Sequence, residues 1–576
     1  MTNEYEKYFE EACKWMNSDK VDENVKEELS TVFEQLKTYF YAPLEFGTAG
    51  LRSIMRPGIN GMNTTTVRHF TQGLANLIKD ENGETKGVAI AYDSRNNSFL
   101  FAKTAAEVLA ASNIKVYFYE ELHPTPTLSF AIRELGCIAG INITASHNAK
   151  EYNGYKVYWE DGAQLPPNHA DTVANYVKSL DIFKDVHYIA FEDGLRNGLI
   201  TLIGKEIDEK YLCNVLAQQV NPNAIKEVAN DFKIVYTPIH GTGYRLVPEV
   251  LKRAGIKEEN LLLVKEQMIL DGNFPTTSKP NPEIKECFNL GIELAKENNC
   301  DLLIGTDPDA DRTGIVIKTN TGNFITLSGN QVGALLVNYI IQAAKETNTL
   351  PANACVIKTI VTTELVSKIC KENNVTLLNV LTGFKFIGEK IKEFEASHEY
   401  TYLFGFEESY GYLKGTYARD KDAVVASLLI TEMAAYYKKQ GKTLYDALME
   451  LYQKYGYFLD AVFTVKKEGV TANEEMKKSM QNLRSNLPNE INGIEVLKIR
   501  DYQSSIIKDL KTGEESNTNL PVSNVIFFEM ADGSNLIVRP SGTEPIIKIY
   551  CGIPAENAES ANAKLEEYKK ELLKML

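Results

Sequence analysis

Short apolar runs alternate with amphipathic segments along most of the 576-residue chain. Residues 87–95, GVAIAYDSR, have the apolar run of a buried strand, residues 99–112 have helical spacing, and residues 114–120 form a second apolar run. The same order of strand, loop and helix recurs in two later blocks, at residues 232–317 and 355–411. This alternation predicts α/β layers rather than a helix bundle or a β-sandwich.

The last part of the chain has a different pattern. Residues 461–470 and 524–552 have the spacing of strands joined by tight turns, and residues 558–576 have that of an amphipathic helix. We therefore predict a smaller α+β domain there. No low-complexity segment and no long linker rich in Pro, Gly or Ser separates the blocks, so we expect them to pack closely.

The composition is that of an ordinary globular protein, with 44% hydrophobic and 24% charged residues. Asp and Glu outnumber Lys and Arg by 77 to 62, which gives a net charge of -15, and no basic run stands out. Nucleic-acid binding as the main function is therefore not expected, since phosphate backbones select basic surfaces. The apolar segments 331–346 and 423–439 are short and interrupted, which predicts buried helices and no membrane span.

The cysteines and the N-terminal segment bear on the cellular compartment. Eight cysteines are scattered along the chain, and no Cys-x-x-Cys pair occurs. Reduced, mostly buried thiols are the simplest interpretation of that pattern. Residues 1–20 are charged and helical in pattern, without the basic start and apolar run of a signal peptide. We therefore expect a cytoplasmic protein.

Ser146 lies beside His147 in the stretch TASHN, directly behind a predicted strand. A hydrolase nucleophile needs small residues on both sides of its Ser, but Thr144 and Asn148 hold those positions. Adjacent side chains of an extended segment point to opposite faces, so we expect His147 to be badly placed to take a proton from Ser146. Taken alone, the stretch is best interpreted as a polar turn that satisfies its own backbone.

Three carboxylates recur at every second residue in DPDADR, residues 307–312. In an extended chain Asp307, Asp309 and Asp311 project to one side and can converge on a hard cation. Pro308 disfavours the helix that would fan them apart. Three oxygen ligands leave coordination positions free, which suits Mg²⁺ that also contacts a phosphate. A solvated acidic turn is the alternative.

The stretch RPSGTEP, residues 539–545, lies between two predicted strands of the last domain. Its hydroxyls, its Gly and its Arg could form a cradle for an anion, and Lys548 could add charge from the next strand. An ordinary hairpin turn that contains Ser and Gly is the alternative.

Two further loops have a chemical pattern. In GFEESYG, residues 405–411, Glu407, Glu408 and Ser409 could bind sugar hydroxyls, although a plain exposed acidic loop fits equally well. HGTGYRL, residues 240–246, begins like a dinucleotide-binding loop but lacks the third glycine. No nucleotide cofactor is therefore predicted.

The order of these motifs resembles that of the α-D-phosphohexomutase superfamily. The motifs are TASHN with NGYK, then DPDADR, then GFEESYG and then RPSGTEP. FGTAGLR at residues 46–52, TGFKFIG at 382–388 and RDKD at 419–422 add to the resemblance, which spans about residues 40 to 550. It implies three related α/β (mixed-sheet) domains plus a C-terminal α+β domain around a central active-site cleft. The expected domains are 1–204 with the phosphoserine loop, 205–325 with the metal loop, 326–455 with the sugar-binding loop, and 456–576 with the phosphate cradle.

The resemblance also implies a role for each motif. Ser146 would carry the phosphate and, with Asp307, Asp309 and Asp311, would bind one Mg²⁺ per subunit. The other catalytic residues would be Arg52, His147 and Lys156, with Lys156 or a neighbour assisting proton transfer. The sugar-binding residues would be Thr382, Gly383, Lys385, Glu407 and Ser409. The phosphate-binding residues would be Arg312, Arg539, Ser541, Gly542, Thr543 and Lys548.

The activity implied is the interconversion of glucose 1-phosphate and glucose 6-phosphate through a phosphoserine enzyme and glucose 1,6-bisphosphate. Glu408 favours glucose, since superfamily members that also accept mannose tend to carry Met there. Tyr410 and the chain length resemble a branch that includes phosphopentomutases, so pentose phosphates are the first alternative and mannose phosphates the second. The partners expected are small sugar phosphates, and the chain would be a monomer or a homodimer.

Two functions outside the mutases are also compatible with part of the pattern. A Mg²⁺-dependent sugar-phosphate phosphatase would use the same aspartates but would not need a second phosphate cradle. A non-catalytic sugar-phosphate binding protein would leave Ser146 and the aspartates unexplained.

Overall fold

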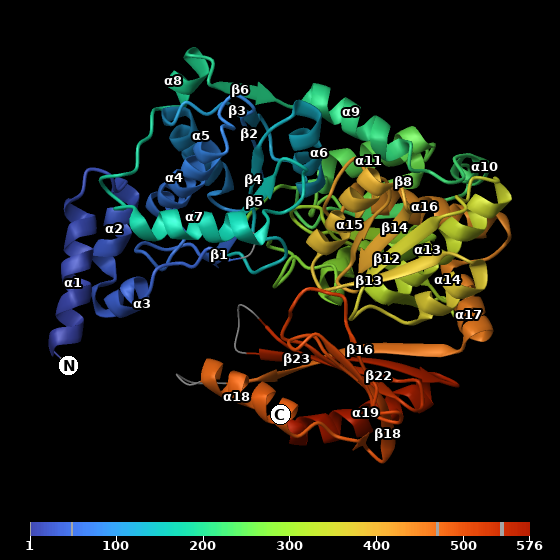
Figure 1. Ribbon diagram of the computed structural model, residues 1–576. Coiled ribbons are helices and arrows are strands. Elements are labelled where there is room, and N and C mark those ends of the chain that lie inside the picture. Colours follow the sequence, from blue (N-terminus) through green and yellow to red (C-terminus); the bar gives the residue numbers. More distant parts are fainter. Residues whose placement is uncertain (1, 48–49, 468–471, 542–545) are drawn as a thin grey trace.

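The computed structural model of the chain describes residues 2–47, 50–467, 472–541 and 546–576 (Figure 1). It begins with a small helical cluster in which Trp15 packs against Phe40, with ring centroids 5.8 Å apart. The predicted N-terminal helix is confirmed. The elements of this cluster are α1 (Thr2–Asn17), α2 (Glu23–Thr31), the 3-10 turn η1 (Phe33–Gln35) and α3 (Leu36–Phe40).

The first α/β domain contains a six-stranded sheet in the order β1-β5-β4-β2-β3-β6. β5 runs antiparallel to both of its neighbours, and the other pairs are parallel. Helices α4 and α5 share the apolar core on one face, whereas α6 packs on the opposite face toward the second domain. The strands are β1 (Gly50–Ile54), β2 (Val88–Tyr92), β3 (Val116–Tyr119), β4 (Ala139–Ile143), β5 (Tyr152–Trp159) and β6 (Ile200–Ile203). The helices are α4 (Thr64–Asp80), α5 (Ser98–Ala111), α6 (Thr125–Leu135), α7 (Pro167–Ser179) and α8 (Phe191–Arg196).

The second domain repeats the plan with five strands in the order β11-β10-β9-β7-β8. β9 and β10 form an antiparallel pair, and the loop between them is the acidic segment DPDADR. The strands are β7 (Ile234–Thr237), β8 (Leu261–Leu263), β9 (Leu302–Thr306), β10 (Thr313–Lys318) and β11 (Phe324–Thr326). The helices are α9 (Lys205–Leu216), α10 (Asn223–Val228), α11 (Gly243–Ala254), η2 (Glu258–Asn260), η3 (Lys285–Phe288) and α12 (Asn289–Glu297).

The third domain has four strands in the order β13-β12-β14-β15, with only the last pair antiparallel. Helices α13 and α16 are buried along most of their length, as predicted from their apolar segments. Within the described residues, no helix combines the length and the apolar character that a membrane span needs. The strands are β12 (Ala354–Thr359), β13 (Thr376–Val380), β14 (Thr401–Glu407) and β15 (Gly411–Leu413). The helices are α13 (Gly329–Glu346), α14 (Leu365–Asn373), α15 (Phe384–Ser397), α16 (Ala423–Lys439) and α17 (Leu444–Tyr455).

The C-terminal domain, orange to red in Figure 1, is built on an antiparallel sheet in the order β16-β23-β22-β21-β18-β19-β20, with β17 paired to β18. One face of the sheet is covered by α18 and α19, and the other packs against Ile360, Val361 and Leu381 of the third domain. The predicted α+β domain is confirmed. The strands are β16 (Tyr457–Lys466), β17 (Glu490–Ile491), β18 (Ile494–Asp501), β19 (Ile506–Asp509), β20 (Glu515–Asn517), β21 (Ile526–Met530), β22 (Asn535–Pro540) and β23 (Ile546–Ala555). The helices are α18 (Ala472–Ser485) and α19 (Ala558–Met575).

Candidate active site

Ser146 lies in the loop after β4 and adopts a left-handed backbone conformation, with φ of 53°. Its hydroxyl donates to Asp307 Oδ2 at 2.9 Å, and its Oγ lies 3.1 Å from His147 Nδ1. The expectation that His147 points away from Ser146 was therefore wrong. The alternation of side chains holds for extended backbone, and the left-handed residue interrupts it.

His147 is half-buried between cationic side chains. Burial, together with the positive charges of Arg312 and Arg52, holds the pKa of His147 well below its ordinary value. The imidazole is therefore neutral at physiological pH. Arg52, on β1, donates to Asn148 Oδ1 at 2.9 Å, which ties the strand to the Ser146 loop.

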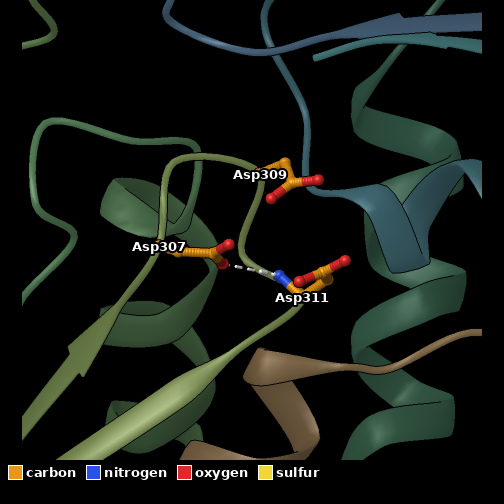
Figure 2. Close-up of side chains that lie close together, drawn as sticks. All are labelled: Asp307, Asp309 and Asp311. Carbon is orange, nitrogen blue, oxygen red and sulfur yellow. Dashed lines mark hydrogen bonds between the residues drawn. The ribbon is translucent and has the colours of Figure 1, made fainter. Parts of the chain in front are cut away.

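The three aspartates of the loop between β9 and β10 converge, as predicted. Asp307, Asp309 and Asp311 are at most 2% exposed, and each contributes an oxygen within 4.8 Å of the others (Figure 2). Asp307 Oδ1 accepts hydrogen bonds from the backbone N–H groups of Asp311 at 3.1 Å and Arg312 at 3.0 Å. This burial contradicts the alternative of a solvated acidic turn.

The cluster has the chemistry of a cation site. Burial and the charges of Asp309 and Asp311 raise the pKa of Asp307 well above its ordinary range. Within the described part of the chain, Asp309 Oδ1 and Asp311 Oδ1 have no hydrogen-bond partner. Buried carboxylate oxygens without donors are unfavourable unless a cation compensates them, so these residues fit a divalent ion.

Two lysines from other domains border the aspartates. Lys156 Nζ, from β5, lies 2.8 Å from Asp309 Oδ2, and Lys421 Nζ lies 3.2 Å from Asp311 Oδ2. Burial lowers the pKa of Lys421, but the carboxylates of Asp311 and Asp420 outweigh it and raise the pKa far above its ordinary value. Both ammonium groups thus oppose the negative charge of the cluster.

The sequence motif RDKD joins three domains at this point. Asp420 pairs with Lys421 at 2.9 Å and accepts hydrogen bonds from Tyr158 at 2.8 Å and Gln164 at 3.3 Å, both in the first domain. The sequence alone indicated no role for these residues. The signal was a cluster of charges directly before the apolar helix α16.

Thr125, at the start of α6, was missed by sequence reasoning altogether. Its backbone N–H donates to Asp309 O at 2.8 Å, and its hydroxyl donates to Asp309 Oδ2 at 2.9 Å. Asn142 Nδ2 in turn donates to the Thr125 hydroxyl oxygen at 2.7 Å. The first domain therefore orients the metal loop of the second.

The predicted sugar-binding residues gather at the end of β14. Glu407 is buried, and its Oε1 accepts from the backbone N–H of Gly383 at 2.9 Å. Gly383 has φ of 122°, a conformation that favours glycine. Arg312 of the metal loop forms a β-bridge with Gly411, so the two loops are neighbours. Burial excludes the interpretation of Glu407 as part of an exposed acidic loop.

The remaining sugar-loop residues border the same region. Thr382 Oγ1 is buried and lacks a hydrogen-bond partner within the described residues. Lys385 lies on the first turn of α15, and burial lowers its pKa. Ser409 is half-buried in the turn between β14 and β15. The hydroxyl of Thr382 is therefore a buried polar group whose hydrogen bond is not satisfied by the described residues.

The predicted phosphate cradle lies on the C-terminal sheet. Arg539 on β22 and Lys548 on β23 are directly opposite in the strand register, and the backbone N–H of Ser541 donates to Ile546 O at 2.8 Å. Like charges directly opposite each other destabilise a sheet, and a bound anion would relieve that repulsion. Ile537 and Tyr550, two residues away on the same strands, pack against the third domain, so Arg539 and Lys548 lie on the face of the sheet that meets the domain of the sugar loop. Gly542 and Thr543 lie outside the described residues.

Comparisons with known proteins agree with this geometry. Three descriptions of the phosphoglucomutase/phosphomannomutase family match the chain: alpha/beta/alpha domain I at residues 43–182, domain II at 209–322 and domain III at 328–455. A phosphoglucomutase of Staphylococcus haemolyticus (strain JCSC1435) is 36% identical over 537 residues, 92% of this chain and 94% of its own. The chain belongs to this family. A phosphoglucomutase of Staphylococcus aureus (strain MRSA252) is 38% identical over 528 residues, 91% of this chain and 92% of its own.

Solved structures of phosphoglucomutase/phosphomannomutase proteins share the fold. The open form of pp63/parafusin, a phosphoglucomutase from Paramecium, matches with a TM-score of 0.69 at 18% identity, covering 93% of this chain and 95% of that chain. A putative phosphomannomutase from Thermus thermophilus matches with a TM-score of 0.67 at 20% identity, covering 92% and 99%. The resemblance to the α-D-phosphohexomutase superfamily and the predicted fold class are confirmed.

The carboxylate cluster predicts cation binding that can be measured without substrate. A divalent cation should raise the melting temperature of the wild-type protein, because a ligand that binds only the folded state stabilises that state increasingly as its concentration exceeds Kd. Asp309→Asn should abolish most of that shift, whereas Asp171→Asn, which removes an exposed carboxylate on α7, should retain it. Thermal unfolding with and without the cation provides the measurement. An equal shift in the Asp309 variant would contradict the site.

Glu408 predicts a pH-dependent stability. Burial and the neighbouring charge of Glu407 raise the pKa of Glu408 to about 7. A carboxyl with a raised pKa takes up a proton on folding, so it destabilises the native state increasingly as pH rises from about 4 to about 7. Glu408→Gln should therefore melt above the wild type at pH 8, and the difference should shrink toward pH 4. Glu399→Gln, at an exposed position, is the control. A pH-independent difference for Glu408→Gln would refute the expectation.

Proposed function

We propose that the chain is a phosphoglucomutase that interconverts α-D-glucose 1-phosphate and glucose 6-phosphate, with Ser146 as phosphate carrier and glucose 1,6-bisphosphate as intermediate. The observation that carries the proposal is the 2.9 Å contact between Ser146 Oγ and Asp307 Oδ2. It puts a hydroxyl next to a buried carboxylate cluster, while a separate pair of cations, Arg539 and Lys548, lies on the sheet face that meets the third domain, which carries the sugar loop. A phosphatase would need the first site and not the second.

One Mg²⁺ held by Asp307, Asp309 and Asp311, with the Ser146 oxygen, would neutralise the charge of the phosphoryl group. Loose phosphoryl transfer asks a protein mainly for in-line positioning and for fixed positive charge. Lys156 supplies that charge from β5, where its Nζ lies 2.8 Å from Asp309 Oδ2. Arg52 lies beside the Ser146 loop and adds a second cation.

The reaction consists of two transfers that use the same serine. In the first, the bond between the Ser146 oxygen and phosphorus breaks, and the C6 hydroxyl of glucose 1-phosphate forms a new bond to phosphorus. That hydroxyl loses its proton while the released Ser146 oxygen gains one, a transfer that we propose Lys156 or a neighbour assists. In the second, the bond between the C1 oxygen of the bisphosphate and phosphorus breaks, the Ser146 oxygen loses its proton and bonds to that phosphorus, and the C1 oxygen gains a proton, which gives glucose 6-phosphate. The bisphosphate must turn over between the two steps, so Arg539 and Lys548 must bind the phosphate at either end of the sugar. Glu407, Ser409 and Thr382 are proposed to bind the hydroxyl groups between them.

The proposal also includes the domain boundaries, the cellular location and the binding partners. We propose four domains with the boundaries expected from the sequence, except that β11 extends across position 325 and moves that boundary beyond Thr326. A cytoplasmic location is supported by the eight cysteines, all of which are free thiols. Small sugar phosphates are the proposed partners of a monomer or homodimer.

A substrate panel tests the function directly. Glucose, mannose, ribose and deoxyribose 1-phosphates should be compared, with and without glucose 1,6-bisphosphate and Mg²⁺. We expect glucose 1-phosphate to be isomerised fastest, and Ser146→Ala to be inactive with an unchanged melting temperature, because only one small hydroxyl is lost. Ser179→Ala on the exposed face of α7 is the matched control. Release of inorganic phosphate without isomerisation, or full activity of Ser146→Ala, would refute the proposal.

The phosphate cradle predicts a defect in binding. Arg539→Ala should raise KM about 10- to 100-fold, since a hydrogen bond to a charged group contributes roughly 1.5–3 kcal/mol. The melting temperature should change little, because Arg539 is only half-buried. Lys498→Ala, an exposed cation on β18 of the same sheet that pairs with Asp509, should leave KM unchanged. Steady-state kinetics with glucose 1-phosphate would decide, and an unchanged KM for Arg539→Ala would exclude the cradle.

A further inference from the structure

Arg95 is a buried cation that the proposed chemistry does not use. It follows β2, and its guanidinium donates to four backbone carbonyl groups of the segment after β4. Nη2 binds Ser146 O at 2.6 Å and Asn148 O at 2.5 Å, whereas Nη1 binds Ala149 O at 2.9 Å and Tyr152 O at 3.1 Å. One side chain therefore binds four carbonyl groups of the loop that carries Ser146.

Asp93 holds the guanidinium of Arg95 in place. Its Nε lies 3.4 Å from Asp93 Oδ2, and both side chains are completely buried. Asp93 Oδ1 accepts from the Arg95 backbone N–H at 2.9 Å and from the Ser98 hydroxyl at 2.7 Å. The guanidinium of Arg95 is thus held in one orientation. A fixed guanidinium can in turn hold the strained backbone of the Ser146 loop in place.

A residue of the second domain packs against the guanidinium of Arg95. The ring centroid of Phe274 lies 5.0 Å from Arg95 Cζ, and Phe274 is 2% exposed. The same loop approaches the first domain closely: Asn96 Nδ2 donates to Asn273 Oδ1 at 3.1 Å, and a Cβ on Gly272 would meet Asn96 N at 2.3 Å. The cation–π contact therefore crosses from one domain to the next.

The loop that carries Phe274 is anchored by His240. His240 Nδ1 lies 2.7 Å from Ile269 O, and its Nε2 lies 2.9 Å from Thr276 Oγ1. The two ring nitrogens thus hold both ends of the segment that contains Phe274. The imidazole is 1% exposed, so this anchor lies inside the second domain.

The residues that follow His240 contact the metal loop. The backbone N–H of Thr242 donates to Pro308 O at 2.8 Å, and a Cβ on Gly241 would meet Pro308 Cα at 2.4 Å. The HGTG stretch, which resembled an incomplete dinucleotide loop, therefore connects the carboxylate loop to the loop that carries Phe274. The loop that carries Asp307 contacts this turn directly, and the loop that carries Ser146 is connected to it through Arg95 and Phe274.

We infer that Arg95 and Phe274 are positioning residues for phosphoryl transfer, an inference that rests on the proposed function. Arg95 holds Ser146 in its left-handed conformation, and Phe274 aligns Arg95 with the domain that carries Asp307. The pair sets the relative position of Ser146 Oγ and the carboxylates without touching the substrate. A misplacement of about 1 Å can cost about 100-fold in rate, so we assign the pair an effect on kcat rather than on KM.

Two conservative variants test the inference. Arg95→Lys keeps the charge but replaces a five-donor fork with one ammonium group, which cannot reach four carbonyl groups. Phe274→Leu keeps an apolar side chain but removes the aromatic face. Tyr188→Leu is the matched control, because Arg68 lies 4.2 Å from the Tyr188 ring centroid at a site that contacts none of these loops.

The readouts are kcat, KM, the rate at which glucose 1,6-bisphosphate phosphorylates Ser146, and hydrogen–deuterium exchange of residues 144–152. We expect kcat and the phosphorylation rate to fall about 10- to 100-fold in both variants, with KM changed less than about threefold. Exchange in residues 144–152 should accelerate in both variants, and all readouts should be unchanged in Tyr188→Leu. If Arg95→Lys does not fold, Phe274→Leu alone decides.

Wild-type kcat in Phe274→Leu, or a rise in KM without a fall in kcat, would overturn the inference. Slower turnover with unchanged exchange in residues 144–152 would also overturn it. The proposed function fails by a different result: wild-type protein that isomerises no sugar phosphate. In that case the exchange measurement still reports whether Arg95 and Phe274 hold the loop.

Discussion

Three carboxylates buried side by side are the constraint on which the rest of the site depends. Asp307, Asp309 and Asp311 repel one another and have been removed from water, a condition that is unfavourable unless positive charge surrounds it. The first domain supplies Lys156 and the third supplies Lys421. Electrostatic balance therefore favours the meeting of three domains at one point.

The chain meets this requirement largely with loops and with the ends of regular elements, whereas Lys156 lies within β5. Thr125 donates to Asp309 at the start of a helix, and Arg312 bridges to Gly411 between two loops. The sheets of the three α/β domains fix the ends of these loops, and the loops carry polar groups that contact the carboxylates. The fourth domain adds Arg539 and Lys548, on a sheet whose helices lie on its far face.

The sequence predicted what depends on local spacing. The alternating layers, the aspartates of the DPDADR loop and the motif order all follow from short-range pattern, and the structure and the relatives agree with them. The orientation of His147 could not be predicted, because it depends on a left-handed Ser146 whose carbonyl group is held by Arg95. Thr125 could not be predicted either, since 184 residues separate it from Asp309.

The link between the third and C-terminal domains has a consequence for affinity. Gly456, with φ of 90°, is the single residue between α17 and β16, and the two domains meet through apolar side chains such as Ile360, Leu381 and Ile537. Gly456 has a left-handed conformation that favours glycine, so we expect any closure of the C-terminal domain over the third to pivot at this residue. The apparent dissociation constant of a sugar phosphate then equals the intrinsic constant divided by the fraction of molecules that are closed. A substitution near Gly456 could therefore weaken every substrate by the same factor and leave selectivity intact.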